Sequence, residues 1–68
     1  MDAVALLGKN VRTLRKAAAL SQEELAFRAN MKRTYLSDLE RGMRNPSVRA
    51  LGRLADALDV PPDRLLAR

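Results

Sequence analysis

The chain of 68 residues contains no cysteine and no histidine. Disulfides and thiol chemistry are therefore excluded, and the usual zinc ligands are absent. Aromatic residues make up only 3% of the chain, so a core must be built from Leu, Val and Ala, which suits short helices at close distance. No apolar run approaches the ~20 residues that span a bilayer, and the N-terminus carries no signal-like stretch. We expect a cytoplasmic protein without a membrane partner.

A chain of this length has room for one domain and one modest core, because such chains bury only about 60% of their unfolded surface. We expect residues 1–68 to form a single all-α domain. The net charge of +5 at pH 7 and the pI of about 10.8 favour a polyanionic partner, either nucleic acid or an acidic membrane surface. The segment from Arg41 to Arg53 holds four arginines and no acidic residue, so the positive charge is concentrated there.

The segment from Gln22 to Arg41 predicts two short helices joined by a tight turn. Apolar residues recur at helical spacing on both sides of Asn30, a residue type that tolerates the left-handed backbone of such a turn. Ser21 and Glu24 have the spacing of a capping box, which fixes the start of the first of these helices. The predicted buried faces consist of Leu25, Ala26, Ala29, Leu36 and Leu39.

Three further helices are predicted around this pair. Apolar spacing indicates one helix from about Val4 to Ala18, and Gly42 ends the helix that starts near Lys32 or Arg33. Pro61 or Pro62 opens a short fifth helix. Ser47 caps the fourth, whose predicted buried face is Val48, Leu51, Leu54, Ala55 and Leu58.

These residues resemble the helix-turn-helix domains of the Xre or phage-repressor type. The resemblance rests on SQEELA, YLSDLERG, RNPS and LADALDVPPDRLL, which occur in this order and at the usual separations. It implies a five-helix, lambda-repressor-like DNA-binding domain with the helix-turn-helix at the second and third helices. RTYLS followed by ERG and RN also resembles the controller proteins of restriction-modification systems, one branch of this family.

In the family, the third helix reads base edges in the major groove. Arg33 can give two parallel donors to guanine, and Asp38 can accept from a cytosine amino group or orient Arg33. Family members commonly carry a capping Ser, Thr or Asp where this chain has Lys32, and we interpret that departure as a DNA contact. The alternative is a solvated helix face. The predicted base contacts are Lys32, Arg33, Thr34, Ser37 and Asp38.

Other polar residues are predicted to hold the DNA backbone. A helix N-terminus suits a phosphate, and the loop after the third helix is expected to run along the duplex. For Gln22 the alternative is a plain helix former. The Tyr35 ring is expected to pack against the first or second helix while its hydroxyl contacts a phosphate, and the alternative is a half-buried core residue only. The predicted phosphate contacts are Gln22, Tyr35, Arg41, Arg44 and Asn45.

Two further features concern the scaffold. The resemblance implies a partly buried ion pair between Arg15 and Glu40, which fixes the third helix on the first. One reader helix covers few base pairs, so a two-fold homodimer is expected. Val60, Leu65 and Leu66 are the candidate interface residues, although they can also simply seal the core.

The sequence therefore predicts a transcriptional regulator that binds double-stranded DNA. The alternative is a protein-interaction module of the same fold, such as an antitoxin or an adaptor. An enzyme is not expected, because the serines are better explained as caps or reader residues and no histidine can activate them. No metal, cofactor or small-molecule ligand is expected either.

Overall fold

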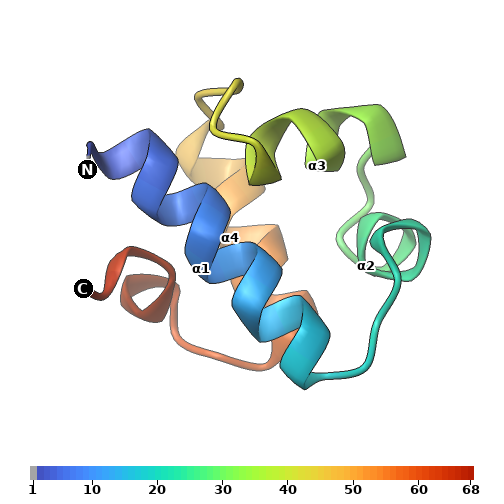
Figure 1. Ribbon diagram of the computed structural model, residues 1–68. Helices are drawn as coiled ribbons and strands as arrows, with labels where there is room; N and C mark the ends of the chain where they lie inside the picture. The colour runs from blue at the N-terminus through green and yellow to red at the C-terminus, as the bar shows by residue number, and fades with distance from the viewer. Residues whose placement is uncertain (1) are drawn as a thin grey trace.

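The computed structural model describes residues 2–68, so Met1 of the predicted domain lies outside the described residues. Within that range there are α-helices and one 3₁₀ helix but no strand, as Figure 1 shows. The elements in chain order are α1 (Ala3–Ala17), α2 (Gln22–Arg28), α3 (Arg33–Glu40), α4 (Val48–Leu58) and η1 (Pro62–Leu66). None of the described helices is long and apolar enough to cross a membrane.

Local capping explains where the α-helices begin. The Ser21 hydroxyl accepts from the Glu24 amide at 3.0 Å, and the Glu24 carboxylate accepts from the Ser21 amide at 3.0 Å, which completes the predicted capping box. Ser47 caps α4 in the same way, at 3.0 Å from the Ala50 amide. Asp2 caps α1.

The turns between the helices use left-handed residues. Asn30, between α2 and α3, has a φ of 55°, as predicted, and Gly42 after α3 has a φ of 74°. Ala19, between α1 and α2, has a φ of 58°, which sequence reasoning did not anticipate because alanine rarely adopts it.

The core lies where α1 meets the other elements. In Figure 1, α3 lies along one side of α1 and η1 along the other, and α2 packs against both α3 and α4. The side chains that fill this space are aliphatic, as the scarcity of aromatics requires. The largest fully buried ones are Val11, Leu25, Leu36, Leu39, Leu54 and Leu65.

Two predictions about the C-terminal half need correction. The segment after Pro61 is a 3₁₀ helix of five residues, which is too short for a stable α-helix of its own, so the described fold has four α-helices rather than five. Val48 is 86% exposed and does not belong to the buried face of α4. It occupies the first position of the helix, and the buried face starts with Ala50.

Gly8 marks the closest approach of α1 and α3. A Cβ at this position would collide with the Leu39 carbonyl oxygen and lie 2.9 Å from that of Glu40, and both are backbone atoms. We expect Gly8→Ala to lower the free energy of unfolding by about 1–3 kcal/mol, because α3 must shift. Urea denaturation measures the change.

Gly52 offers the matched control, since nothing lies within 4 Å of a Cβ added there. Gly52→Ala, inside α4, is expected to raise the free energy of unfolding by up to about 1 kcal/mol, because alanine loses less backbone entropy. Equal effects of the two substitutions would contradict the close contact at Gly8.

The capping box also predicts a pH dependence. The hydrogen bond from the Ser21 backbone, then that from its hydroxyl, lowers the pKa of Glu24 below the ordinary value of 4.5. A lowered pKa in the folded state adds stability that is fully present above pH 4.5 and is lost as the pH falls through the folded pKa. Glu24→Gln is therefore expected to be less stable than the parent at neutral pH and to approach it in acid, as thermal unfolding between pH 7 and pH 3 would record. A difference in stability between Glu24→Gln and the parent that stays constant from pH 7 to pH 3 would contradict a lowered pKa of Glu24.

Candidate nucleic-acid interface

The N-terminal end of α3 projects into solvent. Lys32 is the N-cap residue, and its side chain makes no capping hydrogen bond. Arg33 and Thr34 follow in the first turn, and all three are exposed. Ser37, one turn further on, is half-buried but faces a hollow. All five predicted base contacts, Asp38 included, therefore keep accessible surface, with Leu36 and Leu39 buried behind them.

Of the two roles predicted for Asp38, the orientation of Arg33 is wrong, and the contact with a cytosine amino group stays a prediction. Its carboxylate pairs with Arg41 at 2.6 Å and lies 3.9 Å from Arg44, so it does not orient Arg33. Positions 38 and 41 are one turn apart on the same side of the chain, whereas positions 33 and 38 lie about 140° apart around a helix with 3.6 residues per turn. Asp38 thus ties the reader helix to the arginines that follow it.

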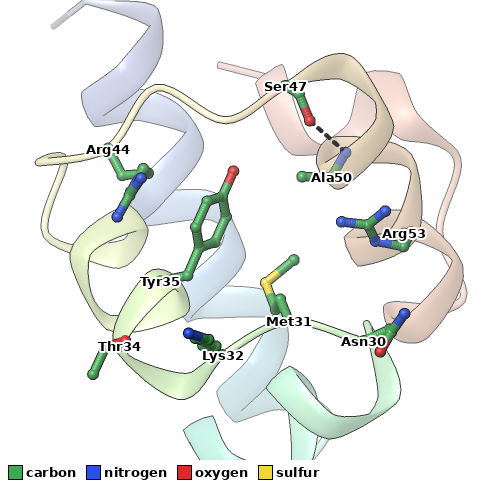
Figure 2. Close-up of a pocket in the computed structure, with 9 residues that line it drawn as sticks. All are labelled: Asn30, Met31, Lys32, Thr34, Tyr35, Arg44, Ser47, Ala50 and Arg53. Carbon is green, nitrogen blue, oxygen red and sulfur yellow. Dashed lines mark hydrogen bonds between the residues drawn. The ribbon is translucent and has the colours of Figure 1, made fainter.

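Tyr35 also departs from expectation, because its ring faces α4 rather than α1 or α2. Figure 2 shows the ring standing between α3 and α4, beside Arg44, whose guanidinium carbon lies 4.6 Å from the ring centroid. This distance suits a cation–π contact, which orients Arg44 along the edge of the interface. The ring is half-buried and packs against the core.

The ring forms part of a hollow of about 370 Å³ between α3 and α4. Ser47 and Arg53 line it as well, and sequence reasoning did not assign them to the interface. Arg53 donates from Nε to the Ala29 carbonyl oxygen at 3.1 Å and so secures the C-terminal end of α2. The complete lining, drawn in Figure 2, is Asn30, Met31, Lys32, Thr34, Tyr35, Arg44, Ser47, Ala50 and Arg53.

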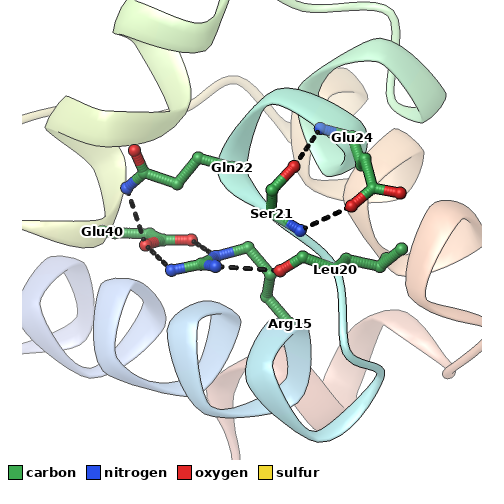
Figure 3. Close-up of polar contacts among 6 residues, drawn as sticks. All are labelled: Arg15, Leu20, Ser21, Gln22, Glu24 and Glu40. Atoms are coloured by element: carbon green, nitrogen blue, oxygen red, sulfur yellow. Dashed lines mark hydrogen bonds and ion pairs between the residues drawn. The ribbon is translucent and has the colours of Figure 1, made fainter.

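A polar network on the other side of α3 fixes its orientation. Arg15 on α1 donates to both carboxylate oxygens of Glu40, at 2.7 and 3.1 Å, and these side chains are only 11% and 3% exposed. This is the pair that the resemblance implies. Arg15 also donates to the Leu20 carbonyl oxygen at 2.9 Å, as Figure 3 shows. Each of its three side-chain nitrogens thus donates one hydrogen bond within the protein.

Gln22 joins the same network at the start of α2. Its side-chain Nε2 donates to the Glu40 carboxylate at 3.0 Å (Figure 3). The amide therefore connects α2 to the end of α3, and this is a role that neither of the sequence-based alternatives included. Its amide oxygen remains available to a donor.

The loop after α3 carries the remaining predicted phosphate contacts. Arg41, Arg44 and Asn45 are all exposed. The Asp38 carboxylate restrains both arginines, and Gly42 turns the chain between them with its positive φ. The loop therefore presents two positioned cations beside the reader helix.

The predicted dimer residues do not share one environment. Leu65 is fully buried, so its assignment to a dimer interface is wrong, and it seals the core between α1 and α4. Val60 is half-buried against that core, while Leu66 is 44% exposed. Other apolar surface is provided by Val48, which is exposed, and by a hollow whose lining includes Val4, Pro46, Leu51 and Leu66.

With this geometry described, comparison with known proteins identifies the class. A family model described as "Helix-turn-helix" matches residues 11–65, and the chain belongs to this family. Control protein C.BamHI of Bacillus amyloliquefaciens is 45% identical over 62 residues, which cover 90% of this chain and 76% of that protein. The predicted resemblance to Xre-type regulators and to their controller-protein branch is confirmed.

Solved structures agree with the fold. The restriction-modification controller protein C.AhdI from Aeromonas hydrophila has a TM-score of 0.89 and 44% identity, covering 91% of this chain and 94% of that one. SinR, a master regulator for biofilm formation solved in complex with DNA, has a TM-score of 0.85 and 35% identity, covering 90% of this chain and 98% of its own. These relatives are named as control proteins and regulators rather than as enzymes.

Proposed function

We propose that this protein is a transcriptional regulator that binds double-stranded DNA sequence-specifically and places α3 in the major groove. The observation that carries the proposal is the exposure of Lys32, Arg33 and Thr34 at the free end of a helix whose other end is held by the Arg15–Glu40 pair. Rigid presentation of such side chains suits the reading of base edges. A regulator of this kind works on cytoplasmic DNA.

The flanks of α3 support a backbone contact on each side. Lys32, Tyr35, Arg44 and Arg53 surround the hollow toward α4, and Gln22 and Arg41 lie toward α1. We assign the phosphate contacts to Gln22, Tyr35, Arg41, Arg44 and Asn45, and add Arg53 from its place in the hollow. Base contacts are assigned to Lys32, Arg33, Thr34, Ser37 and Asp38.

We further propose that the protein acts as a homodimer on a near-palindromic operator. The exposed side chains of Val48 and Leu66, with half-buried Val60, provide apolar surface that a partner copy would cover. Two reader helices about 34 Å apart would then meet successive major grooves. A monomeric mass by sedimentation at high micromolar concentration would refute this part of the proposal.

Selection of bound sequences from a random DNA pool tests the main proposal. A regulator of this type is expected to enrich a short two-fold sequence, and its spacing reports the distance between the reader helices. Enrichment of no sequence, together with affinity that does not fall with added salt, would refute DNA recognition.

A protein-interaction module remains the second candidate, and one observation favours it. Phe27 on α2 is 85% exposed, so its ring is available to contact a partner protein. A module that acts only in this way would form no salt-sensitive, sequence-selective complex with DNA. The same selection experiment therefore separates the two functions.

A further inference from the structure

Two hollows adjoin each other along the α1 side of the reader helix. One, of about 240 Å³, includes Gln22, Ser37, Arg12 and Arg41 in its lining. The other, of about 360 Å³, continues along α1 past Lys9 and Thr13 and shares Arg12 and Arg41 with the first. Together they form a continuous surface, here called the α1 track, that leads from the start of α2 and from Ser37 on α3 along the outer side of α1.

The charge of the α1 track is positive and largely unneutralised. Glu40 is the only acidic residue lining it, and its carboxylate is already occupied by Arg15 and Gln22. Lys9 and Arg12 are exposed and form no ion pair with any carboxylate of residues 2–68. They are three positions apart on one helix, so their side chains emerge on the same face.

We propose that Lys9 and Arg12 bind phosphate groups of the DNA strand that flanks α3 on its α1 side. This inference rests on the proposed function and extends it to a helix that sequence reasoning treated as scaffold. A helix in a major groove about 12 Å wide has a sugar–phosphate strand on either side. The hollow around Tyr35 and Arg44 faces one strand, and the α1 track faces the other.

The two cations lie close enough together to reach neighbouring phosphates of one strand. Positions 9 and 12 are separated by a rise of roughly 4.5 Å along α1, from three residues at 1.5 Å each. Phosphates recur every ~3.4 Å of duplex axis on each strand. Flexible lysine and arginine side chains span the small difference, so two neighbouring phosphates can be held at once.

The test measures the affinity of the full chain for its selected operator as a function of salt concentration. The Lys9→Gln/Arg12→Gln double variant is expected to reduce the slope of log affinity against log salt by about 1.8, since each lost phosphate contact removes about 0.9. Its base preference is expected to stay that of the parent, because neither residue lies on α3. Both side chains are exposed, and an unchanged thermal unfolding curve checks that the variant folds.

The matched control is Arg64→Gln/Arg68→Gln, which removes the same charge from the C-terminal region. Both residues are exposed, and Arg64 lies on η1, on the opposite side of α1 from α3 (Figure 1). The control is expected to keep the parent's slope. If the Lys9/Arg12 variant keeps the parent's salt slope, or if the control loses as much slope, the proposed phosphate contacts on the α1 track are wrong. Neither result would contradict the regulator function. Absence of any salt-sensitive binding by the parent would overturn both.

Discussion

Replacing Arg15 with alanine is expected to lower the free energy of unfolding by about 3–5 kcal/mol. The substitution leaves the Glu40 carboxylate, only 3% exposed, without its charged partner, and an uncompensated buried charge costs this much. In a domain of this size each kcal/mol shifts the midpoint by roughly 4–8 °C, so thermal unfolding followed by circular dichroism resolves the effect easily.

The control for this substitution is Arg41→Ala, which breaks the other close ion pair described in residues 2–68. That pair is as short, at 2.6 Å, but its side chains are 66% and 36% exposed. Exposed pairs contribute at most about 1 kcal/mol. If Arg15→Ala and Arg41→Ala unfold at the same temperature, burial does not govern the strength of the Arg15–Glu40 pair.

Replacing Arg33 with alanine is expected to weaken binding to the selected operator by about 5- to 150-fold. One well-formed pair of hydrogen bonds to a guanine edge contributes about 1–3 kcal/mol of discrimination, which corresponds to this range. Because Arg33 is exposed and lies ahead of the buried residues of α3, its loss is not expected to alter folding. Fluorescence anisotropy with the operator and with scrambled DNA measures both affinities.

The comparison of the two DNAs is what makes this test specific. A base-reading role predicts that Arg33→Ala loses affinity for the operator mainly, and that selection with the variant relaxes the preference at one base pair in each half-site. A phosphate-binding role predicts an equal loss on both DNAs and a lower salt slope. The second pattern would show that Arg33 contacts a phosphate rather than a base.

The fold could be predicted from the sequence to the extent that local interactions determine it. Ser21 and Ser47 bond within their own first turns, so the starts of α2 and α4 follow from residues three positions apart. Asn30 has its positive φ for a similarly local reason. The Arg15–Glu40 pair spans 25 positions and came only from the family resemblance.

The missed features depend on where the helices pack. The side of α3 on which Tyr35 lies, and the burial of Leu65 against α1 and α4, follow from the crossing of elements that are distant in the chain. Asp38 had several arginines within reach, and the sequence could not choose among them. Arg12 lies on α1, and only the placement of α3 brings it to the hollow that Ser37 also lines.

The side chains of Lys32, Arg33 and Thr34 hydrogen-bond no other residue within 2–68, whereas Glu40 at the far end of the same helix is enclosed by its partners. Substitution of the first group is therefore expected to change the DNA target while leaving the fold intact, whereas substitution of Glu40 is expected to destabilise the fold. A designer who wishes to redirect the protein has this freedom over those three codons.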